Sequence, residues 1–271
     1  VIVAMGKLGG REMTASSDLD LILIYDFDHD APDSDGARSL HGSQYFARLT
    51  QRLISAFTTR TNYGVLYEVD MRLRPSGRAG PLASRIDSFA EYQEHEAWTW
   101  EHQALVRARV VAGDETLGQA FEQVRQKVLQ RSRDLPQLRK EVVEMRQKMR
   151  DQLGSSKQKA ASLFNVKQDA GGIVDIEFMV QYAALAWAYQ APKIVQYTDN
   201  IRILGSLEEA GLLDATSVAQ LIAAYKAYRS TGHRLALQQQ EAVLAGEGLF
   251  EVEREQVSHI WHQLIEIEQA S

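Results

Sequence analysis

Short apolar runs alternate with amphipathic stretches over the first part of the chain. Residues 1–5 are apolar and end at Gly6, and residues 20–25 form a second apolar run, so both predict buried strands. The glycine-rich stretch 6–10 predicts a turn between them. Residues 39–59 carry apolar side chains at helical spacing, which predicts an amphipathic helix.

Residues 66–73 alternate with period two, as a strand does. Leu66, Glu68, Asp70 and Arg72 are predicted to share one direction, while the intervening apolar side chains point the other way. This strand therefore carries an aspartate and an arginine on one face.

Beyond Gly113 the pattern becomes almost entirely helical. It predicts helices at 115–153 with a break at Pro136, 173–189, 199–210, 214–245 and 249–269, and a polar linker at 154–172. Residues 87–110, before this change, are predicted to be mostly helical. We therefore expect an α+β protein, with a mixed domain over residues 1–113 and an all-α helical bundle over residues 114–271.

Composition narrows the class of protein. The 271 residues are 45% hydrophobic and 24% charged, which is ordinary for a chain that buries a core. The net charge of −6 argues against a nucleic-acid partner.

Without cysteine the chain has neither disulfides nor cysteine-based zinc sites, which is compatible with the reducing cytoplasm, where we expect it. No apolar run reaches the roughly 20 residues that cross a membrane, so we expect no membrane-spanning segment in this sequence. Because it starts at Val1, we expect it to be a piece of a longer protein.

Two aspartates stand at the start of the second apolar run. Asp18 and Asp20 are two residues apart, so in a strand their carboxylates converge on one side. Like charges this close repel unless a cation or proton lies between them. Mg²⁺ prefers oxygen ligands and leaves coordination positions for substrate phosphates. Taken alone, two aspartates at this spacing are better explained as a solvated loop end or a strand cap.

Asp70 makes the pattern more specific. It lies in the alternating stretch 66–73 and is followed by Arg72 and Arg74. A third carboxylate from a neighbouring strand would allow two metal ions to hold the attacking and leaving oxygens of an in-line displacement. The pattern thus favours Asp18, Asp20 and Asp70 as metal ligands of a nucleotidyltransferase site.

The glycine-rich turn and the residue before Asp18 offer contacts for phosphate. Gly9 and Gly10 would let the backbone approach a phosphate, while Ser17 and Lys7 would supply a hydroxyl and a positive charge. Taken alone, a plain connecting turn explains them better. The spacing matches neither a P-loop nor a dinucleotide-binding turn.

Three segments together resemble a known family. Residues 6–21, with GKLGG and SSDLDL, residues 69–75, VDMRLRP, and residues 171–178, GGIVDIEF, are similar to the glutamine synthetase adenylyltransferase family, the bifunctional adenylyltransferase/adenylyl-removing enzyme. Its members have two homologous halves. The resemblance implies that one half adds AMP from ATP to glutamine synthetase and the other removes it by phosphorolysis.

The direction of transfer rests on one further segment. Residues 96–105, EAWTWEHQAL, and Ser76 after Pro75 resemble the C-terminal, adenylylating half. The resemblance then implies ATP and Mg²⁺ as cofactors and a tyrosine hydroxyl of glutamine synthetase as acceptor. The removing half remains the alternative.

The resemblance also implies roles and partners. Asp18, Asp20 and Asp70 would be ligands, with Asp70 nearest the hydroxyl and acting as its base, and Arg72, Arg74 and Lys7 would contact phosphate. A PII signalling protein and glutamine would regulate transfer. The implied architecture is a nucleotidyltransferase-fold domain with a mixed β-sheet, followed by a helical bundle. A non-catalytic regulatory module is disfavoured by the retained aspartates, and transfer to RNA by the acidic charge.

Four aromatic side chains accompany Glu101 and allow two interpretations. Phe89, Tyr92, Trp98 and Trp100 are either core or a stacking surface for adenine, and their spacing favours core. Glu101 is expected to be a surface carboxylate.

Other polar clusters are expected to be solvated or structural. The aspartates within residues 26–35 lack the glycine and glutamate of a calcium loop. His259 and His262 are expected at the surface. The remaining residues, open between a functional and a structural role, are Asp175 and Glu177 at a helix start and the lysines Lys157, Lys159 and Lys167.

Overall fold

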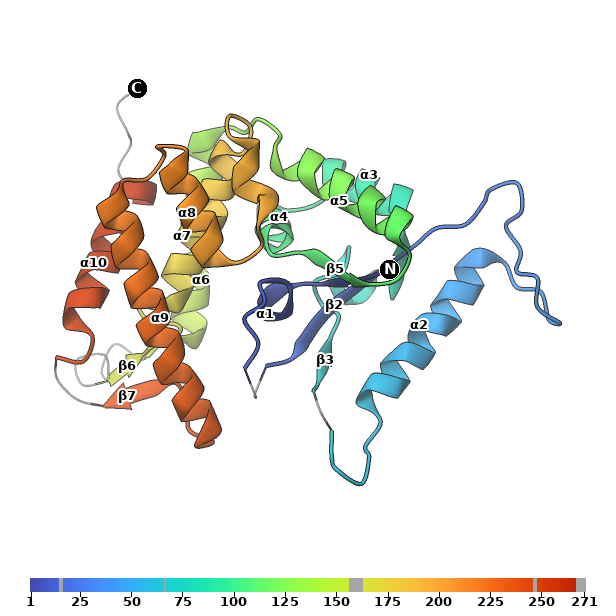
Figure 1. The fold of residues 1–271 in the computed structure, drawn as a ribbon, viewed down its shortest axis with the longest axis horizontal. Helices are drawn as coiled ribbons and strands as arrows, with labels where there is room; N and C mark the ends of the chain where they lie inside the picture. Colours follow the sequence, from blue (N-terminus) through green and yellow to red (C-terminus); the bar gives the residue numbers. More distant parts are fainter. Residues whose placement is uncertain (15–16, 66, 156–162, 246–247, 267–271) are drawn as a thin grey trace. The chain divides into compact units, whose positions relative to one another are not determined.

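The computed structural model describes residues 1–14, 17–65, 67–155, 163–245 and 248–266. It divides the chain into two compact units, Val1–Leu129 and Gln130–Ser271. Figure 1 shows the elements of each.

The first unit is built on a mixed five-stranded sheet. Its strands are β1 (Ile2–Ala4), β2 (Leu19–Tyr25), β3 (Val69–Asp70), β4 (Ala83–Arg85) and β5 (Arg109–Ala112). The order is β3-β2-β1-β5, with β4 also pairing with β2. Strand β1 runs antiparallel to β2 and β5, whereas β3 and β4 both run parallel to β2. The strands predicted at 1–5 and 20–25 are confirmed, and the mixed sheet is as expected.

The described residues of this unit also form helices. They are α1 (Gly6–Gly9), α2 (Gly42–Thr58), α3 (Ile86–His95), α4 (Thr99–Val106), α5 (Glu115–Leu129) and a short 3-10 helix, Gly77–Ala79. Helices α3 and α5 lie side by side (Figure 1), and the rings of Phe89 and Phe121 pack with centroids 5.5 Å apart. Helix α5 therefore belongs to the first unit, although the change in sequence character falls earlier, at Gly113.

Three local expectations for this unit need correction. The glycine-rich turn is one turn of helix, α1. The stretch 87–110 is mostly helical, as expected, but the chain turns between α3 and α4 and then enters β5. The strand expected at 66–73 is reduced to β3, because the chain turns again where Arg74 N–H donates to Met71 O at 3.4 Å. Leu66 lies outside the described residues.

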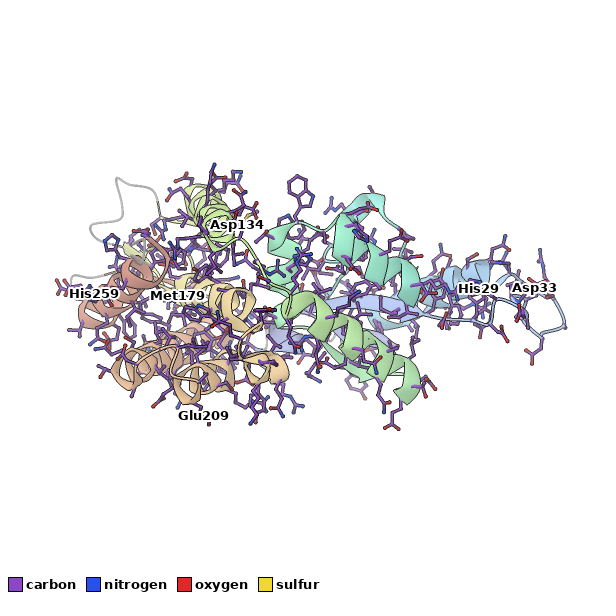
Figure 2. The ribbon with its side chains drawn as sticks, turned by 90° about the horizontal axis from the view of Figure 1, so that it is seen from above. His29, Asp33, Asp134, Met179, Glu209 and His259 are labelled. Carbon is purple, nitrogen blue, oxygen red and sulfur yellow. The ribbon has the colours of Figure 1, made fainter. Side chains whose placement is uncertain are left out.

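The loop after β2 projects from the sheet. Figure 2 shows His29 and Asp33 on it. Arg85 holds its base, because its guanidinium donates to Asp26 Oδ1 at 2.9 Å and to Phe27 O at 3.3 Å. The aspartates beyond Asp26 are exposed, as expected of a solvated loop.

The second unit is mainly helical. Its elements are α6 (Leu135–Leu153), α7 (Ile173–Trp187), α8 (Asn200–Glu209), α9 (Ala215–Leu237), α10 (Glu251–Trp261), two short irregular helices (Pro192–Gln196 and His262–Glu266) and the strands β6 (Leu163–Asn165) and β7 (Val243–Ala245). Helix α7 is the buried centre, and Met179, within it, is 1% exposed (Figure 2).

The expectation of an all-α second unit is wrong. Strands β6 and β7 pair antiparallel, with Phe164 opposite Leu244. Helix α9 ends at Leu237, before the predicted limit, and Gln239 takes a left-handed backbone with φ 56°. The pairing joins segments far apart in sequence, so no local pattern reports it.

None of the helices in the described part of the chain is both long and apolar enough to cross a membrane.

Candidate active site

The structure brings the three predicted aspartates to one edge of the sheet. Strands β2 and β3 run parallel with Asp20 directly opposite Asp70. Asp18 precedes Asp20 by two residues, so it shares the same side as the chain enters β2. Asp18 is exposed, and Asp20 and Asp70 are half-buried. The site therefore opens to solvent on its Asp18 side.

The surroundings of Asp20 disfavour its charge. Burial raises the pKa of the Asp20 carboxyl, and the negative charges of Asp70 and Asp18 raise it further. Lys7 and Arg72 oppose this rise. An added cation would relieve the repulsion, so the electrostatics suit a metal ion.

Asp70 is instead held by an arginine. Arg72 donates to it from the backbone N–H at 2.8 Å and from Nε at 2.6 Å, and its Nη2 forms an ion pair with Oδ2. These hydrogen bonds lower the pKa of the Asp70 carboxyl. Asp70 therefore stays ionised, as a metal ligand must, but this makes it a weak base.

Gly6 makes room for Asp20. It has a φ of +50°, which side chains other than glycine rarely adopt. A Cβ built there would lie 2.3 Å from Asp20 Oδ2. The sequence interpretation overlooked this residue, although its position two residues after the end of β1 was a usable signal.

Gly9 and Gly10 are required by packing. A Cβ on Gly9 would lie 1.7 Å from Arg107 O, and a Cβ on Gly10 would lie 2.4 Å from Arg107 Nη2. Both glycines are buried. They let α1 rest directly on the corner between α4 and β5, and no phosphate is needed to explain them.

Two more of the predicted phosphate contacts, Ser17 and Arg74, have local partners. The hydroxyl of Ser17 accepts from Thr14 N–H at 3.0 Å and lies 2.9 Å from Thr14 Oγ1. Arg74 donates to the carbonyls of Met71 at 2.8 Å and Gly80 at 3.3 Å. Ser17 therefore closes a turn before β2, and Arg74 closes the loop after β3. The neighbouring Ser16 of the predicted motif lies outside the described residues.

The carboxylates fit a metal in part. Within the described residues, no group of three or more histidine or acidic side chains is already arranged to hold a metal ion. The carboxylate of Asp70 is instead paired with the Arg72 guanidinium. A bound cation would have to compete with this exposed arginine, whose side chain is 64% accessible to solvent.

Comparison with known proteins identifies relatives for both units. The family model for glutamate-ammonia ligase adenylyltransferase matches residues 1–124, and that for GlnD PII-uridylyltransferase matches residues 143–256. The chain is 55% identical over 97% of its length to a bifunctional glutamine synthetase adenylyltransferase/adenylyl-removing enzyme from Pseudomonas syringae pv. tomato. It is 56% identical over 87% of its length to the protein of that name from Rhodopseudomonas palustris.

The chain belongs to the glutamine synthetase adenylyltransferase family. It spans 28% of the length of the Pseudomonas relative and 23% of the Rhodopseudomonas one. The resemblance noted in the sequence is thereby confirmed, and the matches do not distinguish the adding half from the removing half.

The spacing of Trp98 and Trp100 had suggested that both belong to the core, but the structure places them at the surface. Trp98 is 70% exposed and Trp100 is 37% exposed, whereas Phe89 is buried. Glu101, expected at the surface, is buried and accepts from Tyr92 Oη and from Trp98 N–H, both at 2.9 Å. A single helical spacing does not apply to these four aromatic residues, because α3 ends at His95 and α4 begins at Thr99.

Asp175 has a structural role in the second unit. It is buried, and its Oδ1 accepts from Arg146 Nε at 2.5 Å and Arg150 Nη2 at 3.1 Å. Its Oδ2 accepts from Gly171 N–H at 2.7 Å. The aspartate thus joins α6 to the start of α7. Glu177, two residues further along α7, is half-buried.

The remaining side chains follow the simpler interpretations. His259 and His262 are exposed, and His262 Nδ1 lies 2.8 Å from Glu266 Oε2. Lys167 is exposed, while Lys157 and Lys159 lie outside the described residues.

Proposed function

We propose that Asp18, Asp20 and Asp70 bind Mg²⁺ and that this chain transfers AMP from ATP to a tyrosine hydroxyl of glutamine synthetase. The observation that carries the proposal is the parallel register that sets Asp20 opposite Asp70, with Asp18 two residues earlier. The names of the curated relatives support both the reaction and the protein acceptor.

The reaction requires a poor nucleophile to attack a charged centre. The phenolic oxygen forms a bond to the α-phosphorus, the bond from that phosphorus to the β-phosphate oxygen breaks, and pyrophosphate leaves. When bound, Mg²⁺ would supply positive charge for the phosphates and lower the barrier to loss of the phenolic proton, whose pKa is ordinarily near 10.

The chain's own residues hold and orient these groups. Asp18 and Asp20 present carboxylates from one strand, and Asp70 presents a third from its neighbour. The sequence interpretation made Asp70 the base as well. Because Arg72 lowers the pKa of Asp70, we now assign it as a ligand, with the phenolic proton passing to solvent.

Two cations are the proposed phosphate contacts. Lys7 lies on α1 close enough to offset the raised pKa of Asp20. Arg72 is exposed and would be released for phosphate when a cation takes its place on Asp70. Gly9, Gly10, Ser17 and Arg74 contribute by keeping the two segments in place.

Regulation is part of the same proposal. An enzyme that modifies glutamine synthetase controls nitrogen assimilation, so we expect a PII signalling protein and glutamine to act on it as effectors. The match of the second unit to a PII-uridylyltransferase model is consistent with a shared helical module.

The direction can be tested with the full chain and two forms of glutamine synthetase. Unmodified enzyme with Mg²⁺ and α-labelled ATP should become labelled on tyrosine, and EDTA should abolish the labelling. Release of label from pre-adenylylated enzyme by phosphate would assign the removing reaction instead. Neither reaction in the presence of Mg²⁺ would contradict the proposed function.

A further inference from the structure

Helix α1 carries Lys7 and contacts Asp20, yet its own sequence gives it little helical stability. It has only four residues, two of them glycine. Isolated helices of this length are unstable in water, and glycine weakens a helix relative to alanine. The position of α1 must therefore be imposed by its neighbours.

Arg109 provides the most direct contact. Its Nε donates to Gly9 O at 3.0 Å and its Nη2 donates to Leu8 O at 3.0 Å. These carbonyls are at the end of α1, where Leu8 O also accepts from Arg11 N–H at 3.2 Å, and Arg109 bridges the two carbonyls from outside the helix. A charged guanidinium also suits the negative end of a helix.

The sheet fixes Arg109 for this task. In the β1–β5 ladder Arg109 lies opposite Ala4, two residues before α1 begins. The backbone of Arg109 is thus tied to β1, and its side chain reaches forward to the end of α1. The neighbouring Arg107 packs against Gly9 and Gly10 at the end of α1. Its guanidinium forms a buried ion pair with Glu12, which follows α1 in the chain.

We propose that Arg109 is a positioning residue, which locks the end of α1 and thereby holds Gly6 and Lys7 against the carboxylate of Asp20. This inference rests on the proposed function, because it assigns α1 to one wall of the adenylyl-transfer site. Asp18, Asp20 and Asp70 are held by β2 and β3, so loss of Arg109 would leave the carboxylates in place.

The substitution Arg109→Ala separates positioning from general stability. We expect it to raise KM for MgATP and lower kcat/KM by 10-fold or more, because small misplacements of binding groups cost this much. Arg109→Lys keeps the charge but loses the two-pronged contact, so it should recover only part of this loss.

A matched control is Arg85→Ala. Arg85 also anchors a segment of the same unit through several acceptors, but it serves the projecting loop. If both variants lower the Tm and only Arg109→Ala changes KM for MgATP, the proposal holds. Unchanged kinetics in Arg109→Ala, within about twofold, would overturn it.

Hydrogen exchange keeps the inference testable apart from the reaction. The amides of residues 6–12 should exchange faster in Arg109→Ala and remain as in the wild type in Arg85→Ala. Faster exchange in this segment, in a chain that transfers no AMP, would support the anchor and refute the proposed function. Unaltered exchange would refute the anchor itself.

Discussion

Two aspartates, Asp20 in the first unit and Asp175 in the second, show opposite uses of the same residue. Asp175 is buried among two arginines and a backbone N–H, all of which stabilise its charge. Asp20 is opposite Asp70 and near Asp18, and both raise its pKa. A carboxylate surrounded by hydrogen-bond donors has its charge balanced within the protein and serves the structure. A carboxylate surrounded by other carboxylates is suited to bind a cation.

The largest expected effect is on catalysis at Asp20. The substitution Asp20→Asn removes the charge but almost no volume. We expect AMP transfer to fall by about 10³-fold or more, equivalent to about 4 kcal/mol, because a metal ligand stabilises charge in the transition state. Initial rates with labelled ATP and glutamine synthetase measure it.

Asp35→Asn is the matched control for this change. Asp35 is an exposed aspartate of the projecting loop, so its loss should leave the rate unaltered. If the activity of Asp20→Asn stays within about tenfold of the wild type, Asp20 is not a metal ligand, and its contrast with the structural Asp175 fails.

Asp175 should produce the next largest effect, on stability. Asp175→Ala leaves Arg146 buried without its partner carboxylate, which costs about 3–5 kcal/mol. Chemical denaturation of the full chain measures the loss. Replacing both partners, as Asp175→Leu with Arg146→Met, should recover much of it. A cost below about 1 kcal/mol for Asp175→Ala would show that the pair is dispensable.

At Asp20 the effect on stability should have the opposite sign. Without metal, Asp20→Asn should stabilise the chain by about 0.5–2 kcal/mol, as removal of a strained functional charge commonly does. The pKa of Asp20 is raised in the folded state. The charged carboxylate therefore destabilises the folded wild type most at pH values above this raised pKa. The gain should therefore shrink as pH falls through that value and vanish below the unfolded pKa, near 3.9. A destabilised variant at neutral pH would contradict the account.

The sequence predicted the carboxylate edge well, because its signals are local. Asp18 and Asp20 are two residues apart at the start of an apolar run, and Asp70 stands before the segment with its two arginines. Strand periodicity then decides which way such side chains point. The remaining step, that these strands are neighbours, was a hypothesis built on the three aspartates, and the register of β2 and β3 matches it.

What the sequence could not predict depends on distant contacts. Gly9 and Gly10 were interpreted as phosphate contacts, but the backbone and side chain of Arg107 explain them. The partner of Asp175 is Arg146, 29 residues away on another helix. Trp98 was assigned to the core because spacing alone does not show where helix α4 starts.

Binding of Mg²⁺ tests the central claim most directly. Thermal unfolding of the wild type, Asp20→Asn and Asp35→Asn should be followed while Mg²⁺ is added with a non-hydrolysable ATP analogue. At about tenfold excess over Kd, the wild type and Asp35→Asn should gain about 1.4 kcal/mol, and Asp20→Asn should gain nothing. Equal stabilisation of all three proteins would show that these aspartates do not hold the metal.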